Sequence, residues 1–307
     1  MPSTSNDKLY FLAFDHRGFF RRELVGADDV LSDEQRETIQ DAKRLILEGV
    51  RLAAAGTPEG LGILVDDEFG ADLVAPAREL GILVAMPAER SDREIFEFNH
   101  GDRFGEEILA ADPDITKVLV RYNAEGDRDG NAVQGERLRE LSDWLAAHER
   151  SFLLELIVEP TPAQLASVEG DIERFEEELR PELIRLAIGE LQQAGVEPGI
   201  WKVEGMRDRD AAHAIVEAAR RDGREEVVCV VLGSGAPAER VDEWLRTVAG
   251  VEGFAGFAIG RSIWWPALRR FSAGELDREA AAEQIADAYG SFVEVFEQAR
   301  NGSAVGA

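Results

Sequence analysis

Two lysines of this sequence lie within apolar runs, where a charged side chain is unusual. Lys202 stands in the segment GIWKV, and Lys117 begins the segment KVLVRY. Only four of the 34 basic residues are lysines, and the other two are Lys8 and Lys43. Arginine supplies positive charge elsewhere, but a lysine amine can lose its proton and attack a carbonyl carbon. We interpret Lys202 as a candidate Schiff-base nucleophile, which burial and the nearby cation of Lys117 would shift toward its neutral form.

A carboxylate also interrupts an apolar run. Glu155 lies inside the segment FLLELIV, and Glu204 follows Lys202 by two residues. Side chains alternate along a strand, so Lys202 and Glu204 share one face. If that face and the face that carries Glu155 point inward, Glu155, Lys202 and Lys117 converge on the barrel interior. Because a buried charge is costly unless it is paired, a second interpretation stays open, in which a Lys–Glu ion pair merely fills the interior.

Glycine-rich turns follow the last two apolar runs. Gly233, Ser234 and Gly235 come after VVCVVL, and Gly260 and Arg261 come after FAGFAI. Backbone N–H groups of such turns bind phosphate in many barrel enzymes, and an arginine adds a forked, charge-assisted contact. The sequence therefore predicts a phosphate site here, although glycines also serve simply to make tight turns.

The first apolar run ends in Asp15, His16, Arg17 and Gly18. Three polar side chains thus meet at one junction between strand and loop, where a capped turn with a surface arginine is the simpler interpretation. The acidic run at 66–68 is a weak candidate for Mg²⁺, because such runs are common in so acidic a chain. His100, His148 and His213 fall in expected helices or loops, so we place them on the surface.

The elements that must position these residues alternate along the chain. Eight apolar runs suit parallel strands buried on both faces, at 10–14, 62–65, 82–86, 117–122, 152–158, 199–203, 227–232 and 254–259. Helices are expected at 33–55, 136–148, 209–221, 238–248 and 279–298, and as two helices that meet near Pro181 within 162–193. Eight βα units predict a single-domain α/β fold, a (β/α)8 TIM barrel over residues 1–300, with a doubly wound open sheet as the alternative. The tail 301–307 is expected to be disordered.

Composition excludes several classes of protein. The net charge of −27 repels phosphate backbones, so we expect no binding to nucleic acid. The single cysteine, Cys229, rules out a disulfide framework, and the four histidines show no metal-binding spacing, so we expect no cofactor and no metal. No apolar run is long enough to span a membrane, and the first residues do not resemble a signal peptide. We expect a cytoplasmic protein that forms a homo-oligomer.

Five short motifs occur here in the order found in a known group of enzymes. They are LAFDHRG at 12–18, VRYN at 120–123, FLLE at 152–155, WKVEG at 201–205 and AIGR at 258–261. With them, the chain resembles class I aldolases of the tagatose-1,6-bisphosphate aldolase type over residues 10–296. It is most similar to the aldolase domain of inositol catabolism, which acts on 2-deoxy-5-keto-gluconate 6-phosphate. It departs from the tagatose type at residues 233–235, where that type has a turn like Ser-Ala-Gly.

The resemblance implies a role for each matching residue. Lys202 would form the Schiff base, with Glu155 and Lys117 as the acid–base pair around it. Asp15 would contact substrate hydroxyls, and Arg261 with the turn at 233–235 would hold phosphate. The implied reaction is a retro-aldol cleavage of a ketose-type sugar phosphate into dihydroxyacetone phosphate and malonate semialdehyde, with no metal.

Three alternatives remain at this stage. The substrate could be another sugar phosphate, such as tagatose 1,6-bisphosphate or a sulfonated sugar phosphate, and a second anion site would then be needed, for which Arg17 and Arg121 are candidates. The chain could instead be a non-catalytic barrel that binds sugar phosphates. A metal-dependent lyase would lose its activity in a chelator.

Overall fold

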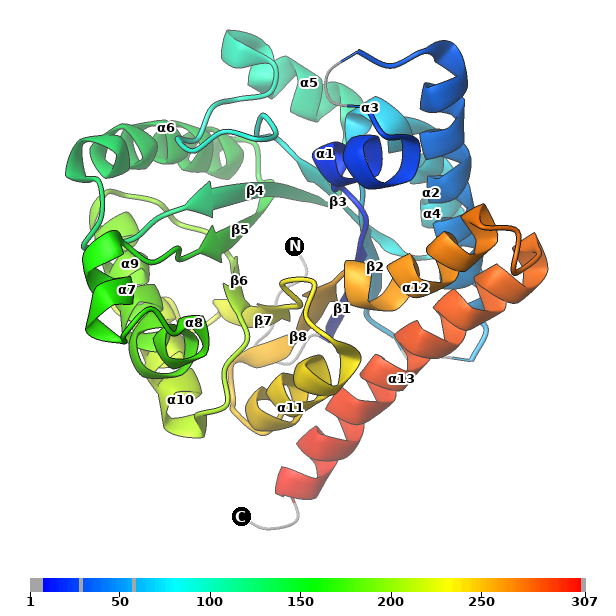
Figure 1. The fold of residues 1–307 in the computed structure, drawn as a ribbon. Coiled ribbons are helices and arrows are strands. Elements are labelled where there is room, and N and C mark those ends of the chain that lie inside the picture. The colour runs from blue at the N-terminus through cyan, green and yellow to red at the C-terminus, as the bar shows by residue number, and fades with distance from the viewer. Residues whose placement is uncertain (1–7, 28–29, 57–58, 305–307) are drawn as a thin grey trace.

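Eight parallel strands close into a barrel in the order in which they occur in the chain, as the sequence predicts (Figure 1). The computed structural model describes residues 8–27, 30–56 and 59–304. The strands are β1 (Leu9–Ala13), β2 (Leu61–Leu64), β3 (Leu83–Pro87), β4 (Ile115–Arg121), β5 (Ser151–Ile157), β6 (Ile200–Glu204), β7 (Val228–Leu232) and β8 (Phe254–Ile259). The open sheet that we kept as an alternative is therefore wrong, because β1 pairs with both β2 and β8.

Helices form the outer ring around these strands. The longer ones are α2 (Asp33–Ala54), α6 (Arg128–Ala147), α9 (Arg180–Gln193), α10 (Arg209–Ala219), α11 (Ala238–Val248), α12 (Arg261–Ser272) and α13 (Arg278–Ala304). Short helices are α1 (Arg17–Phe19), α3 (Asp67–Gly70), α4 (Val74–Glu79), α5 (Phe104–Ala111), α7 (Pro162–Ser167) and α8 (Ile172–Arg174). The π-helical turns are η1 (Phe20–Leu24) and η4 (Phe175–Leu179), and the 3₁₀ turns are η2 (Ala71–Leu73) and η3 (Gly101–Arg103).

Local sequence explains where the first long helix begins. The hydroxyl of Ser32 accepts a hydrogen bond from the Gln35 backbone N–H at 3.1 Å, and the Gln35 side chain accepts one from the Ser32 N–H at 2.9 Å. This reciprocal capping box satisfies two of the N–H groups that a helix start leaves free. Helix α13 packs along α2, and Arg278 ties the two together through Asp41 and Glu48.

Apolar side chains fill the barrel in two separate layers. Inward-facing residues of the strands, among them Phe11, Leu153 and Val230, form a plug in the barrel interior. A larger cluster lies between the outer faces of the strands and the helices. The plug ends below the carboxyl ends of the strands, so the polar residues that follow it on the same strand faces open onto the mouth of the barrel.

Two predicted segments differ from the structure. The connection at 162–193 has a further break at 168–171, because Glu169 and Gly170 adopt left-handed conformations and Asp171 caps the next helix. The junction expected near Pro181 is the change from η4 to α9 at Arg180. Pro181 lies in the first turn of α9, directly after η4, where its missing N–H costs little. The tail predicted to be disordered continues α13 as far as Ala304, and 305–307 lie outside the described residues. None of the described helices is long and apolar enough to cross a membrane.

Candidate active site

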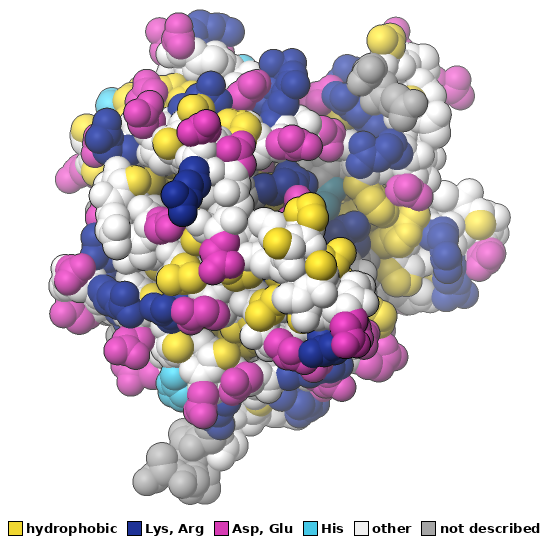
Figure 2. All heavy atoms as spheres, turned by 60° about the vertical axis from the view of Figure 1, so that its left-hand side comes forward, with side chains coloured by type: hydrophobic (Ala, Val, Ile, Leu, Met, Phe, Trp, Pro, Cys, Tyr) yellow, Lys and Arg dark blue, Asp and Glu magenta, His cyan; other side chains and the backbone are white. Residues whose placement is uncertain are grey.

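A cavity of about 580 Å³ occupies the mouth of the barrel. Every residue that the sequence predicts for the site lines it: Asp15, Arg17, Lys117, Glu155, Lys202, Gly233, Ser234, Gly235, Gly260 and Arg261. Figure 2 shows acidic and basic side chains interspersed over one face of the molecule, with basic side chains at the edge of a hollow. The predicted residues therefore share one space, as the alternation of side chains along each strand requires.

Lys202 and Glu155 form a close ion pair at the floor of this cavity. The Lys202 Nζ lies 2.8 Å from Glu155 Oε1, and the two side chains are 4% and 10% exposed. Their strands are neighbours, and the two residues are directly in register. Burial alone would raise the pKa of Glu155, but Lys117 and Lys202 outweigh burial and lower it. Glu155 is therefore a carboxylate within reach of the lysine that is predicted to react.

Lys117 lies at the centre of three carboxylates. Its Nζ is 2.9 Å from Asp15 Oδ2, 2.8 Å from Glu89 Oε1 and 3.0 Å from Glu155 Oε2. Burial alone would lower the pKa of Lys117, but these three acids raise it well above its ordinary value. This favours a fixed positive charge beside Glu155 over the proton exchange that the resemblance implies for Lys117.

Asp15 and His16 follow the end of β1 and differ in charge near neutral pH. Burial alone would raise the pKa of Asp15, but the cations Lys117 and Lys202 help to lower it below the usual range. Burial lowers the pKa of His16 to about 4, although Asp15 acts in the other direction. Near neutral pH the site thus holds an aspartate anion beside an uncharged imidazole.

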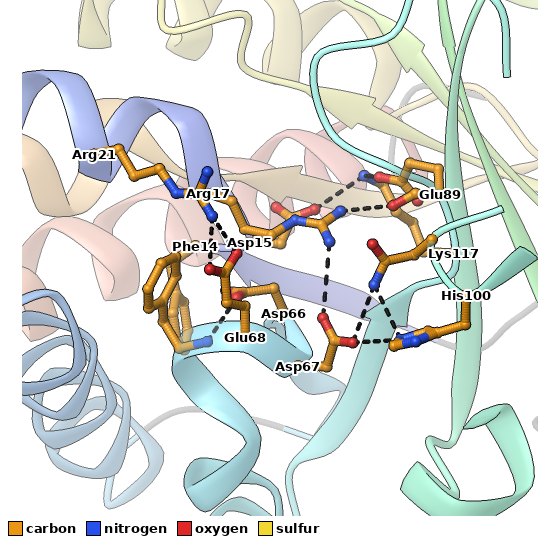
Figure 3. A network of polar contacts seen from close by, with 12 residues as sticks. Phe14, Asp15, Arg17, Arg21, Asp66, Asp67, Glu68, Glu89, His100 and Lys117 are labelled. Atoms are coloured by element: carbon orange, nitrogen blue, oxygen red, sulfur yellow. Dashed lines mark hydrogen bonds and ion pairs between the residues drawn. The ribbon is translucent and has the colours of Figure 1, made fainter. Parts of the chain in front are cut away.

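Glu89 belongs to this network and was missed by sequence reasoning. It follows β3, and its side chain bonds Lys117 while its other oxygen, Oε2, is buried without a hydrogen-bond partner among the described residues (Figure 3). Burial outweighs the attraction of Lys117 and Arg17 and raises the pKa of Glu89. Its place just after β3 is the signal that could have found it, since the other site residues also lie at strand ends, but a single glutamate is unremarkable in so acidic a chain.

The glycine turns and Arg261 lie together at the other end of the cavity. Ser234 and Gly235 both have positive φ, and a Cβ on Gly235 would stand 2.8 Å from the Arg261 guanidinium carbon. Glycine therefore lets the guanidinium approach the turn. Burial lowers the pKa of Arg261, and its Nε has no hydrogen-bond partner in the described structure. A half-buried guanidinium whose buried Nε has no partner suits an anionic ligand.

Arg17 and Arg121, the candidates for a second anion site, already have protein partners. Arg17 donates to the Glu89 carbonyl at 2.6 Å and lies 3.7 Å from Asp67. Arg121 donates from its Nε to the carboxylate of Glu159 at 3.0 Å. Arg17 therefore acts mainly to hold the backbone of Glu89 in place, and Arg121 lies at the exposed rim.

The acidic run at 66–68 is divided among three different partners (Figure 3). Asp66 pairs with Lys43, and Glu68 pairs with Arg21. Asp67 accepts a hydrogen bond from the His100 ring at 2.8 Å, so the imidazole that we placed on the surface is half-buried and paired with a carboxylate. Among the described residues, no group of three or more His, Cys, Asp and Glu side chains is arranged to hold a metal ion.

Two solved structures share this fold over most of their length. Fructose-bisphosphate aldolase from Plasmodium falciparum, solved with TRAP and a small-molecule inhibitor, superposes with a TM-score of 0.62 at 13% identity, over 95% of this chain and 91% of that chain. Cgl0159 from Corynebacterium glutamicum superposes with a TM-score of 0.57 at 17% identity, over 92% of this chain and 86% of that chain. Identities this low establish the barrel fold only.

Comparison of the sequence itself gives one family. No curated protein sequence matches the chain. A family model described as "Uncharacterized protein conserved in bacteria (DUF2090)" matches residues 2–300, which is nearly the whole chain. The chain therefore belongs to the DUF2090 family, and its fold within that family is a (β/α)8 barrel with a charged cavity at its mouth.

Proposed function

We propose that this protein is a class I aldolase that cleaves a ketose-type sugar phosphate, with 2-deoxy-5-keto-gluconate 6-phosphate as the substrate. The observation that carries the proposal is the buried contact between Lys202 and Glu155, with Lys117 on the other oxygen of Glu155. This arrangement lies in the same cavity as Arg261, whose Nε lacks a partner among the described residues. A nucleophile, a proton acceptor and an anion site are the parts that this chemistry needs.

Formation of the Schiff base begins with a proton transfer from the Lys202 ammonium to Glu155. The free amine then attacks the C5 ketone of the substrate and gives a carbinolamine. Glu155 returns its proton to the carbinolamine hydroxyl, which leaves as water, so that an iminium ion remains. Lys117 stabilises the carboxylate form of Glu155 before the first transfer and after the second, because its charge stays fixed. Glu155 ends this half of the reaction as it began.

Cleavage then breaks the C3–C4 bond of the substrate. The electrons of that bond move toward the iminium nitrogen and form an enamine, while the C3 hydroxyl gives its proton to a carboxylate, a role that we assign to Asp15. The fragment C1–C3 leaves as malonate semialdehyde. Protonation of the enamine at C4 and addition of water to the resulting iminium release dihydroxyacetone phosphate and regenerate Lys202.

Borohydride trapping tests the covalent step directly. Incubation with dihydroxyacetone phosphate and borohydride should leave a stable adduct on Lys202, located by mass spectrometry of the peptides. Lys202→Arg keeps the charge but removes the nucleophile, so turnover should fall by about 10³-fold or more. Lys8→Arg is the matched control, because Lys8 is partly exposed and pairs with Glu297 away from the cavity. An adduct at another lysine, or activity retained by the Lys202 variant, would refute the mechanism.

The proposed substrate class also indicates where the enzyme acts. We propose that the enzyme acts in the cytoplasm, since sugar phosphates are intracellular metabolites. The expected homo-oligomer stays a prediction, and size-exclusion chromatography with light scattering would measure it.

A further inference from the structure

The cavity extends past Lys202 toward the connection between β5 and β6. There it is lined by Ile172, Glu176, Arg180 and Glu204. Arg180 begins α9 directly after the π-helical turn η4. Such turns are rare and occur often at functional sites. The Schiff-base steps above make no use of this end of the cavity.

Arg180 is buried there without a full set of partners. It is 7% exposed, and its guanidinium lies over the ring of Phe175 at 5.3 Å. One terminal nitrogen donates to Glu176 at 3.2 Å, but Nε is 3.5 Å from Glu204 Oε1 and has no hydrogen-bond partner in the described structure. A buried donor left unpaired costs about 1–3 kcal/mol, so an acceptor supplied by a ligand would remove a penalty.

Other arginines of the cavity are less suited to this task. The Nε of Arg17 is also buried without a partner among the described residues, but its terminal nitrogen donates to the Glu89 carbonyl at 2.6 Å, a shorter contact than that of Arg180 with Glu176 at 3.2 Å. Arg121 is partly exposed and donates to Glu159 at 3.0 Å. Arg22, Arg90 and Arg93 are half-exposed, and solvent screens their charge. Arg261 serves the phosphate end.

We propose that Arg180 binds the carboxylate at the end of the substrate opposite its phosphate, with Glu204 as the group that positions it. The inference rests on the proposed function and deepens it, since it explains selection of a keto-acid phosphate over a neutral sugar phosphate. Arg180 begins α9 and Arg261 begins α12, and these two helices lie on different sides of the barrel (Figure 1). Both arginines line the cavity that holds Lys202. A substrate with an acid at each end can contact both while its ketone reaches Lys202.

Glu204 has the properties of a positioning group. Its Oε2 accepts a hydrogen bond from the Val158 N–H at 2.9 Å, which fixes the carboxyl beside Arg180. Burial raises the pKa of Glu204 to about 7 against the opposing effects of Arg180 and the Val158 N–H, and Glu176 and Glu159 add to the rise. Around neutral pH the carboxyl is therefore protonated for part of the time. In that form it leaves the charge of Arg180 available and can itself donate to a bound carboxylate.

The aldol condensation with two aldehydes, one with a carboxylate and one without, tests this subsite. Wild type and Arg180→Met are assayed with dihydroxyacetone phosphate and either malonate semialdehyde or propanal, which has the same number of carbons and no carboxylate. The variant should lose roughly 10- to 100-fold in kcat/KM for malonate semialdehyde and change less than about threefold for propanal. Arg180→Lys should recover part of the loss, because it keeps the charge but not the fork.

The matched control is Arg185→Met on the same helix, whose guanidinium pairs with Glu182 at the surface. It should leave the ratio of the two rates unchanged. Equal losses for both aldehydes in Arg180→Met, or no loss for either, would overturn the subsite while leaving the Schiff base standing. If dihydroxyacetone phosphate forms no adduct on wild type, the proposed function itself fails, and the subsite is then judged by calorimetric binding of 3-hydroxypropanoate. Wild type should bind this acid roughly 10-fold or more tightly than Arg180→Met, and equal affinities would refute the subsite.

Discussion

The barrel contains two buried lysine–carboxylate pairs with different surroundings. Lys43 and Asp66 are both fully buried, and Lys43 also donates to the Phe14 carbonyl at 2.6 Å and lies 4.7 Å from the centre of the Phe20 ring. Lys202 and Glu155 are also largely buried, but both line the cavity. In the first pair every contact is with protein, whereas the second faces a space that a substrate can enter.

The difference lies in access and in how the counter-ion is shared. Asp66 pairs with Lys43 through one oxygen and caps the start of α3 through the other, and no second cation among the described residues contacts it. Glu155 divides its oxygens between Lys117 and Lys202, so it keeps a cation when Lys202 gives up its proton. The scarcity of lysine in the sequence draws attention to both pairs alike. They differ in their place in the fold, because Lys202 lies in a strand that ends at the cavity and Lys43 lies in a helix.

The largest expected effect comes from removing one partner of each pair and measuring unfolding. Lys43→Met should cost about 3–5 kcal/mol in the free energy of unfolding, because Asp66 is left charged and closed off from water. Lys202→Met should cost less than half of that, because Glu155 retains Lys117 and water can reach it. Denaturant titration measures both, and Lys8→Met at the surface controls for loss of charge and should cost less than about 1 kcal/mol. Equal costs for the two buried lysines would remove the distinction drawn here.

Glu204 is a third buried carboxylate, and its cationic partner Arg180 lies 3.5 Å away, farther than the lysine partners of Asp66 and Glu155. Its pKa rises from the ordinary value of 4.5 to about 7, so the native state binds this proton more tightly than the unfolded state. Native stability from this group is therefore present at low pH and is lost as the pH rises through that interval.

Glu204→Gln cannot titrate and should gain on wild type by up to about 3 kcal/mol between pH 5 and pH 8. The measurement is the free energy of unfolding of each protein across this range, with Glu294→Gln at the surface as the control for loss of one carboxylate. A difference that stays constant with pH would show that Glu204 is charged throughout, and would weaken its assigned role beside Arg180.

The smallest expected effect is the loss in the free energy of unfolding that remains when both charges of the Lys43–Asp66 pair are removed. Lys43→Met combined with Asp66→Asn removes both charges and keeps an oxygen to cap the Phe69 N–H, which Asp66 Oδ1 accepts at 2.9 Å. The double variant should be about 1–2 kcal/mol less stable than wild type and clearly more stable than Lys43→Met alone. Additive losses would mean that the two side chains are not coupled.

Most of the barrel was predictable from sequence because its strands are buried on both faces. Continuous apolar runs marked all eight strands to within about two residues, and the alternation of side chains then placed Glu155 and Lys202 on the inward face. The pair of Lys43 and Asp66 was not predictable, since it joins a helix to the end of a different strand. Periodicity indicates which face of a helix is buried but not which charge it meets.

The position of Arg180 at the cavity could not be predicted from the sequence. Its place at the cavity depends on the path of the long connection at 162–193, and the break at 168–171, which was not predicted, changes that path. Glu89 was obscured for a different reason, because one glutamate after a strand is unremarkable among 61 acidic residues. Burial, which sets the behaviour of both side chains, emerges only when segments distant in the chain are packed together.

The pairing of β1 with β8 has a consequence for how the protein is made. β1 is made before the other strands of the barrel, and the strand that covers its second edge follows only after residues 14–253 have been translated. At roughly 5–20 residues per second the nascent chain keeps an apolar strand with an open edge for ten seconds or more. An open edge can pair with other chains during that time. We therefore expect the yield of active enzyme in a foreign host to depend on whether a chaperone protects that edge.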